Sequence, residues 1–434
     1  MNHDSTTTHR SVWTGRVTSL MTVFALSAAV PFPAALLGGQ TLQAASPAAA
    51  EETKDSTATD EVKVTKSMVK SATDRGANWL IDNQNPDGTF GLQIGEGKHI
   101  PDAGVTALVL HALAVCPRQY REDDGPFITA AVKYLLSQRR DDGGIYEEGK
   151  GLRNYKTSMA LLALSALDEG RTAKYTAEIT TLRDSIANLQ CSEESRPAYD
   201  RDQNRRAYGG IGYGSDRRPD LSNTQMALEA LQAGKLAEDS EVYERVRVFL
   251  ERCQNRKESN DFLDGTEHRS TEDGGFFYYP GESKAENRKN EDGSVSFTSY
   301  GSMTYAAVKS LIYAGLKKDD PQVKAAVDWI RHNFTVTENP GMATPKSPSR
   351  GQMGLYYYYA VMARTLEVLG EPVLIDGEGK SRRWAEELAA ELLSKQSADG
   401  TWVNPVDRWW EGDPALVTAY AVQALSICYR NLEE

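Results

Sequence analysis

Apolar residues recur along this chain in six pairs of helical segments between about residue 62 and residue 430. The first member of each pair mixes charged and apolar residues at helical spacing, which is typical of a helix with one face in water. These segments are residues 77–83, 130–137, 182–189, 243–252, 323–333 and 384–395. The second member is rich in Ala and Leu and apolar nearly all round, which indicates burial among other helices. These segments are residues 106–113, 158–167, 224–231, 305–311, 359–366 and 418–425.

A glycine turn separates the two helices of each pair, and most turns carry an Asp before the glycine and an apolar or aromatic residue after it. The turns contain Gly88, Gly143, Gly209, Gly274, Gly341 and Gly400, so the repeat averages about 62 residues. One such unit cannot bury its apolar face alone, so the units must pack on each other. The pattern predicts an all-α fold, an (α/α)6 toroid of six helical-hairpin repeats with long loops. The mixed helices form its outer ring and the apolar helices its inner ring.

Two long polar insertions, residues 192–207 and 256–296, interrupt the repeat spacing. They are interpreted as solvated surface excursions, with a lid over one mouth of the toroid as the alternative. The four cysteines are scattered and include no Cys-x-x-Cys pair. We therefore expect buried free thiols rather than a disulfide framework.

The N-terminal region differs from the rest of the chain. Arg10 and Arg16 precede an apolar stretch at residues 17–37, and small residues follow it. This order is typical of a secretory signal, so residues 1–45 are predicted to be a signal peptide and the protein to be exported, periplasmic or extracellular. Anchoring of the protein in a membrane by the same segment is the alternative. Residues 46–61 are interpreted as a flexible linker and residues 62–434 as the toroid.

The charge of the chain excludes one class of partner. Lys and Arg number 49 against 61 Asp and Glu, a formal net charge of −12. Nucleic-acid-binding proteins favour basic surfaces, so we expect no nucleic acid partner.

Two of the turns share a longer motif. Residues 84–90 read Gln-Asn-Pro-Asp-Gly-Thr-Phe and residues 396–402 read Gln-Ser-Ala-Asp-Gly-Thr-Trp. The motif resembles the QW-type repeats of squalene–hopene cyclases and, more distantly, the repeats of protein prenyltransferase β subunits, over about residues 62–430. The resemblance implies a toroid that accommodates an isoprenoid or other lipid in its central cavity. It identifies a fold more strongly than a reaction.

The chemistry that the resemblance implies is only partly matched by this chain. Class II terpene cyclases protonate an alkene with an Asp-x-Asp-Asp motif at the start of an inner helix. Asp220 fits the first acid, but Ser222 and Asn223 stand where the other two belong. Prenyltransferase β subunits bind zinc through Asp, Cys and His, and none of the six histidines matches the required position. We therefore expect no standard protonation-initiated cyclisation, no metal and no other cofactor.

Catalysis, if present, is expected to rest on three acids that open inner helices: Asp220, Asp102 and Asp413. N-capping of those helices is the structural alternative. Four aromatic residues are candidates to shape the cavity and bind substrate, with core and turn packing as the alternative. They are Tyr357, Tyr278, Trp409 and Trp410.

One polar residue recurs at a matching position in every inner helix. The six are His111, Ser165, Glu229, Lys309, Arg364 and Gln423. Unpaired burial of charged groups is costly, so they are expected either to pair between helices, as Glu229 with Lys309, or to line a polar lumen. On the second interpretation His111 and Glu229 contact the ligand.

The sequence thus predicts an exported prenyltransferase- or terpene-cyclase-like toroid that accommodates an isoprenoid or lipid and lacks the standard acid motif. Two alternatives stay open: a non-catalytic scaffold that binds a protein or peptide, and a saccharide-active toroid enzyme with paired carboxylates. A deep aromatic pocket with an Asp at its base favours the lipid enzyme. A lumen filled by side chains counts against both enzymes.

Overall fold

The computed structural model describes residues 63–93, 99–169, 173–195, 201–202, 204–214, 218–263 and 265–433. The expected signal peptide and linker lie outside these residues. From residue 63 onward the described chain is one compact unit.

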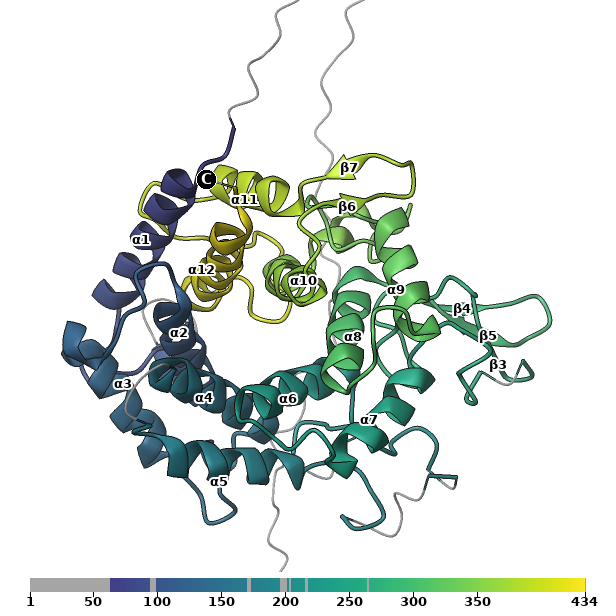
Figure 1. The fold of residues 1–434 in the computed structure, drawn as a ribbon, viewed down its shortest axis with the longest axis horizontal. Helices are drawn as coiled ribbons and strands as arrows, with labels where there is room; N and C mark the ends of the chain where they lie inside the picture. Colours follow the sequence, from purple (N-terminus) through teal and green to yellow (C-terminus); the bar gives the residue numbers. More distant parts are fainter. Residues whose placement is uncertain are drawn as a thin grey trace, which may run out of the picture. The chain divides into compact units, whose positions relative to one another are not determined.

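Twelve α-helices of the described chain form two concentric rings (Figure 1). The outer ring is α1 (Lys66–Asp82), α3 (Pro126–Ser137), α5 (Thr176–Ala187), α7 (Glu241–Arg252), α9 (Pro321–His332) and α11 (Trp384–Ser394). The inner ring is α2 (Ala103–Val115), α4 (Arg153–Asp168), α6 (Leu221–Ala233), α8 (Gly301–Tyr313), α10 (Leu355–Leu369) and α12 (Pro414–Asn431). Each inner helix contacts the next, and α12 contacts α2, so the ring is closed. The predicted (α/α)6 toroid is confirmed.

Burial explains why the helices divide in this way. Every residue of α2 from Ala103 to Ala114 is buried, whereas α7 buries a single face that includes Val246 and Phe249. The apolar helices therefore sit where both sides are covered, and the mixed helices face water.

The strands are short and belong to the loops. β1 (Gly91–Gln93) pairs antiparallel with β2 (His99–Pro101), and β6 (Leu374–Ile375) with β7 (Ser381–Arg382). In the second insertion, β5 (Val295–Phe297) pairs parallel with β3 (His268–Arg269) and antiparallel with β4 (Asn287–Lys289). Two 3₁₀ helices, η1 (Glu122–Asp124) and η3 (Pro348–Gln352), complete the described elements.

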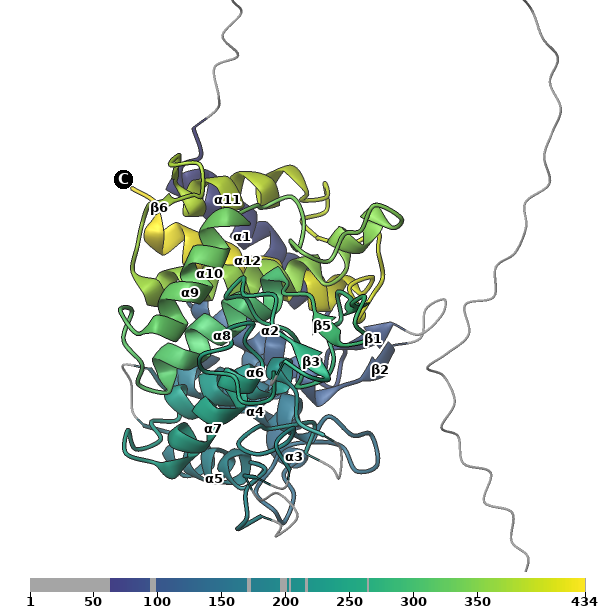
Figure 2. The same ribbon diagram turned by 90° about the vertical axis from the view of Figure 1, so that its right-hand side faces the viewer.

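The second insertion is more than a bare surface excursion, and its sheet does not cover the centre of the ring. Three of its residues, Phe262, Leu263 and Phe277, form a separate apolar cluster with Phe297, the residue that follows the insertion. The three-stranded sheet lies at the outer edge of the ring, beside α9 (Figures 1 and 2). The polar composition of the segment hid these few apolar residues, which are too few and too widely spaced to give a periodic signal.

The glycine turns fasten each repeat to the next. Gly88 has φ +85°, and a Cβ at this position would lie 2.6 Å from a backbone atom of Ala130 in α3. Gln84 Nε2 donates to the Gly88 carbonyl and to the Phe127 carbonyl of α3, both at 2.9 Å. Gln396 makes the corresponding bonds to Gly400 and to α1, so the motif also joins the last repeat to the first. The motif is therefore a joint between repeats.

The starts of the inner helices are capped by the following repeat. The Tyr278 carbonyl accepts from Leu221 N of α6 at 2.9 Å, and the Pro340 carbonyl from Gly301 N of α8 at 2.8 Å. At the starts of α2 and α10, side-chain carboxylates accept hydrogen bonds from backbone N–H groups in the same way, as described below. These bonds satisfy donors that a helix leaves unpaired at its first turn.

Candidate functional site

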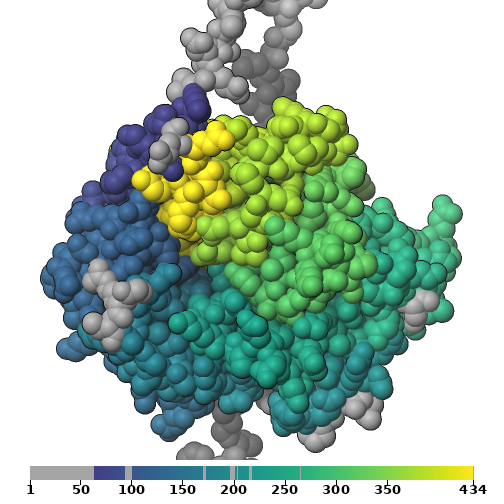
Figure 3. All heavy atoms as spheres, in the orientation of Figure 1, coloured from purple at the N-terminus to yellow at the C-terminus, as the bar shows by residue number. Residues whose placement is uncertain are grey.

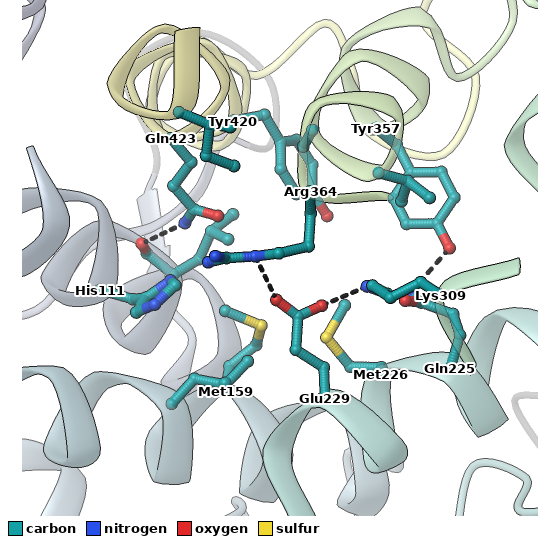
Figure 4. Close-up of a pocket in the computed structure, with 15 residues that line it drawn as sticks. His111, Met159, Gln225, Met226, Glu229, Lys309, Tyr357, Arg364, Tyr420 and Gln423 are labelled. Atoms are coloured by element: carbon teal, nitrogen blue, oxygen red, sulfur yellow. Dashed lines mark hydrogen bonds and ion pairs between the residues drawn. The ribbon is translucent and has the colours of Figure 1, made fainter. Parts of the chain in front are cut away.

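Five of the six recurring polar positions meet in one chamber at the centre of the inner ring (Figure 4). They are His111, Glu229, Lys309, Arg364 and Gln423, each from a different inner helix. Ser165, the sixth, is not among the described residues that line the chamber. Side chains of Leu108, Met159, Leu162, Met226, Val361 and Ile427 supply apolar wall.

A chain of ion pairs occupies the chamber. The Lys309 ammonium donates to Glu229 Oε2, and Arg364 Nε donates to Glu229 Oε1 at 3.0 Å. Arg364 also pairs with Glu367 at 2.8 Å, and Glu367 accepts from Arg430 Nε at 2.9 Å. The expected pairing of Glu229 with Lys309 between helices is confirmed.

Burial and charge act in opposite directions on these groups. Burial alone would raise the pKa of Glu229, but the charges of Lys309 and Arg364 outweigh it and hold the pKa at about 2. The Lys309 side chain is 1% exposed, and burial lowers its pKa even though Glu229 favours the charged form. Glu229 is therefore ionised at neutral pH and is a poor base.

His111 is a neutral member of the chamber. The residue is 5% exposed, and burial, with the charge of Arg364, lowers its pKa to about 4. Its Nδ1 has no hydrogen-bond partner among the described protein atoms. The neighbouring Gln423 donates from Nε2 to the Leu108 carbonyl at 3.2 Å.

Three tyrosines pack at the side of the chamber toward the starts of the inner helices. The Tyr155 and Tyr420 hydroxyls are 3.3 Å apart, and the Tyr357 and Tyr420 rings meet edge to face at 6.2 Å. The Tyr357 hydroxyl accepts from Gln225 Nε2 at 3.0 Å and lies 3.3 Å from Ser222 Oγ. Tyr357 and Tyr420 line the chamber, and substrate binding by Tyr357 stays a prediction.

These side chains leave little free space. The chamber has a volume of about 40 Å³, whereas pockets for organic ligands usually measure about 300–1,000 Å³. Seen along the toroid axis, the described side chains leave no open channel through the ring (Figure 3). In this conformation the chamber holds a few water molecules or one very small ligand.

Asp102 lies outside the chamber wall and caps α2. Its Oδ1 accepts from Gly104 N at 2.8 Å and Val105 N at 3.1 Å, and its Oδ2 pairs with Lys156 at 2.8 Å. Lys156 also pairs with Glu147, whose Oε1 accepts from Ala103 N of α2 at 2.8 Å. Asp102 therefore acts as an N-cap, which was the structural alternative to a catalytic role.

Asp220 caps α6 and is also outside the chamber wall. Its Oδ1 accepts from Asn223 N and its Oδ2 from Asn223 Nδ2, both at 2.9 Å, and Tyr278 is in hydrogen-bonding contact with it. Burial raises the pKa of Asp220 to about 6. Tyr278 thus contacts the acid and not the cavity. A carboxyl with a raised pKa is a weak acid, the opposite of what alkene protonation needs.

Asp413 caps α12, its Oδ1 accepting from Leu416 N at 2.9 Å. Next to it, Glu411 accepts from Tyr357 N at the start of α10 and from Asn404 Nδ2. Burial raises the pKa of Glu411 to about 7. Glu411 was not singled out from the sequence, although it lies two residues before a recognised capping Asp. The three candidate acids lie at the starts of three different helices and do not converge.

Trp409 and Trp410 are not in the cavity wall, which corrects the expectation that they shape it. They are 44% and 51% exposed, on the loop between the last glycine turn and α12. Their φ values are +60° and +68°, in the left-handed region that bulky residues rarely adopt. Their position depends on this unusual backbone, which no sequence pattern announces.

The remaining expectations concern cysteines, metals and membranes. All four cysteines are buried and free, as expected. Within the described residues no group of three or more His, Cys, Asp or Glu side chains is placed to hold a metal ion. None of the described helices combines the length and the apolar character needed to cross a bilayer.

Comparison with known proteins supports the fold. No protein family model matches the chain, and no curated protein matches it. A variant of the type II terpene cyclase MstE from Scytonema, solved with its product merosterolic acid A, is 19% identical with a TM-score of 0.50, covering 85% of this chain and 99% of its own. The GH76A α-1,6-mannanase of Salegentibacter sp. HEL1_6 is 12% identical with a TM-score of 0.51, covering 84% and 100%. An unsaturated glucuronyl hydrolase specific for heparin is 13% identical with a TM-score of 0.52, covering 84% and 98%. The comparison therefore shows an α/α toroid, an architecture found both in this terpene cyclase and in the two saccharide-active enzymes.

Proposed function

We propose that this chain is an exported toroid that acts as a non-catalytic scaffold and binds a protein or peptide on its surface. The closed lumen carries the proposal, because an enzyme of this architecture needs room for its substrate beside the reacting groups. Glu229 is the one carboxylate among the described residues lining the chamber, and two cations already hold it. Export of the protein through a signal peptide at residues 1–45 is part of the proposal, and membrane anchoring by the same residues is the alternative.

The loop formed by residues 403–413 supplies the proposed binding surface. Hydrogen bonds hold it in place: Asn404 Nδ2 donates to Glu411 Oε2 at 2.7 Å, and Asp413 N donates to the Trp410 carbonyl at 3.0 Å. Trp409 packs on Gly354 at the start of α10. The two indoles are therefore presented by a fixed backbone and lose little conformational entropy when a partner covers them.

The energetics of this loop support a role in recognition. Each left-handed bulky residue costs about 1–2 kcal/mol, and two half-exposed indoles forgo the free energy of burial. Tryptophan is enriched at the energetic centres of protein interfaces. The net charge of −12 favours a basic partner segment that also carries apolar side chains. The Arg408 guanidinium already lies over the Trp409 ring, 5.3 Å from its centroid, so this indole needs no cation from a partner.

Titration with model peptides tests this proposal. A Lys/Leu peptide is compared with a Glu/Leu peptide of equal length, using the purified protein and calorimetry. We expect the basic peptide to bind, and the double variant Trp409→Ala/Trp410→Ala to weaken it about tenfold or more. Ile375→Ala, at an apolar position 47% exposed on β6, is the matched control and should bind as the wild type does. Equal binding of the acidic peptide, or no effect of the double variant, would contradict the proposal.

An isoprenoid in the lumen is the second candidate, favoured by the aromatic layer of Tyr155, Tyr357 and Tyr420 beside the chamber. Such a ligand requires these rings and Arg364 to move aside, because about 40 Å³ does not hold it. A photoreactive geranylgeranyl probe distinguishes the two cases. Covalent labelling of α10 or α12 at chamber positions would support the lipid, and labelling confined to the surface would oppose it.

A saccharide-active enzyme needs two carboxylates that flank the glycosidic bond, and the described chamber wall offers only Glu229.

A further inference from the structure

A buried cluster of three charged side chains lies outside the chamber, beside the first turns of α2 and α4. Lys156 of α4 is 1% exposed, and its Nζ lies 2.8 Å from Asp102 Oδ2 and 2.5 Å from Glu147 Oε2. The side chains of Asp102 and Glu147 are 16% and 10% exposed. An amine thus touches a carboxyl group that it can attack and also a second carboxylate that can accept its proton.

The carboxyl group of Asp102 is fixed in place through its two oxygens. Oδ1 accepts from Gly104 N at 2.8 Å and from Val105 N at 3.1 Å, at the positive end of α2. Oδ2 faces the Lys156 ammonium. Attack on the carboxyl carbon places negative charge on an oxygen, and the two N–H groups are already aimed at Oδ1 to stabilise that charge.

Glu147 is held so that one of its oxygens stays directed at the amine. Its Oε1 accepts from Ala103 N at 2.8 Å and from the Tyr134 hydroxyl at 3.2 Å, and its Oε2 contacts Lys156. Because Glu147 and Asp102 contact the same ammonium, Glu147 can move protons between the amine and the Asp102 carboxyl group.

The ion pair in the chamber lacks this arrangement. Lys309 contacts Glu229, but the other Glu229 oxygen accepts from Arg364 Nε, and a guanidinium keeps its protons. Among the described residues, no second carboxylate is paired with Lys309. Lys156 therefore has a second carboxylate to carry its protons, and Lys309 has none.

We propose that Lys156 Nζ and Asp102 Cγ form an amide bond between the two side chains, with Glu147 as the proton carrier. Glu147 first moves a proton from the ammonium to Asp102 Oδ2, and the neutral amine then attacks Cγ to give a tetrahedral intermediate with its charge on Oδ1. Glu147 moves a second proton from the nitrogen to Oδ2, which leaves as water while the carbonyl re-forms. One C–N bond forms and one C–O bond breaks, so an ammonium and a carboxylate become an amide and one water molecule, without an oxidant or a co-reactant.

The charges of the cluster set the pace of this reaction. Burial lowers the pKa of Lys156, but Asp102 and Glu147 outweigh it and raise the pKa above its ordinary value. The ion pair is therefore the resting form, and the bond forms slowly after folding has brought α2 and α4 together (Figure 1). Once formed, it ties residue 102 to residue 156 and restricts the unfolded chain, as a disulfide does. This cross-link goes beyond the proposed scaffold function and does not depend on it.

Mass spectrometry of a tryptic digest of the purified, denatured full chain tests the proposal. Trypsin cleaves after Lys98 and Arg153, so the cross-link joins the peptide that begins at His99 to the one that begins at Asn154. We expect this joined pair in most chains, lighter by one water (about 18 Da) than the sum of the two linear peptides.

Two variants test the part that Glu147 plays. Glu147→Gln keeps an oxygen that can accept from Ala103 N but removes the proton carrier, so the yield of the joined pair should fall about tenfold or more. Glu122→Gln, which breaks a partly exposed pair with Lys174, is the matched control and should keep the yield of the wild type.

Linear peptides alone, with normal cleavage after Lys156, would overturn the proposal, because the cluster is then an ion pair only. An unchanged yield in Glu147→Gln would contradict it as well, since Glu147 then carries no proton. A cross-link between Lys309 and Glu229 would show that contact alone suffices and would refute the geometric argument. Cyclisation of an Asp-Gly turn also loses one water, but it leaves the two peptides separate and so counts against the cross-link. If Glu147→Gln does not fold, the wild-type digest still decides.

Discussion

Replacing Glu229 by Gln removes the carboxylate that holds two buried cations, with almost no change in side-chain shape. The pKa of this group is about 2 in the folded protein against an ordinary value of 4.5. At 1.36 kcal/mol per unit, the difference corresponds to about 3 kcal/mol of stability, close to the 3–5 kcal/mol typical of breaking a buried ion pair. We therefore expect Glu229→Gln to lower the free energy of unfolding by about 3 kcal/mol at pH 7.

The depressed pKa of Glu229 also determines how the effect of Glu229→Gln on stability changes with pH. Because the folded pKa is depressed, the stabilisation is complete above pH 4.5 and is lost as the pH falls toward 2. The variant has no carboxyl group at this position, so the difference in the free energy of unfolding between the wild type and the variant should shrink to about half or less at about pH 3. Urea unfolding followed by circular dichroism at both pH values measures it. Glu241→Gln, which breaks an exposed pair with Arg245, is the control and should cost under about 1 kcal/mol. A deficit below about 1 kcal/mol for Glu229→Gln, or one that is equal at both pH values, would refute the reasoning.

Three further predictions concern the frame around the chamber. A Cβ at Gly274 would lie 2.6 Å from a backbone oxygen of α9, so Gly274→Ala should lower Tm strongly. Gly149 has a similar positive φ but open space around it, so Gly149→Ala should cost only about 1 kcal/mol. Equal effects of the two substitutions would contradict the packing argument. Gln254→Ala removes a buried hydrogen bond to the Gly274 carbonyl of its own turn and a partly buried one to the Gln322 carbonyl of α9 in the next repeat. It should cost about 2 kcal/mol or more in urea unfolding, while Gln138→Ala, in the irregular second turn, should stay within about 0.5 kcal/mol. Burial raises the pKa of Glu411 to about 7, so the folded state binds this proton more tightly than the unfolded state does. The free energy of unfolding should therefore fall as the pH rises from about 5 to about 7.5. Glu411→Gln should remove this pH dependence, and an unchanged pH dependence would mean that another group causes it.

The architecture could be predicted because its determinants repeat. Five of the six glycine turns approach the backbone of the next outer helix, and Gly341 approaches the backbone of Ser299 and Tyr300, so glycine recurs. Each inner helix must bury all its sides, so Ala and Leu recur. The same register alignment placed Glu229 and Lys309 opposite each other. A further repeated signal was missed: a Thr near the start of an inner helix binds the turn before it, as Thr106 does with Phe90 and Thr418 with Trp402.

The site could be predicted only in part, because its other determinants do not repeat. Glu411 caps α10 from the next repeat, a contact that depends on the path of one loop. Trp409 and Trp410 were expected at the cavity because aromatic residues suit cavities, but the left-handed backbone of the loop places them outside. The volume of the lumen depends on how long side chains such as Arg364 and Tyr357 fold across it, and a residue pattern does not specify this.

Lipid content is the most direct test of the proposal that the chain is a scaffold with a closed lumen rather than a toroid that holds a lipid. The protein is purified from its natural host without detergent and extracted with organic solvent, and the extract is quantified by mass spectrometry against the protein. The closed chamber predicts no isoprenoid or other lipid near one molecule per chain. One stoichiometric isoprenoid, lost when Arg364 or Tyr357 is changed to a bulkier residue, would contradict the account.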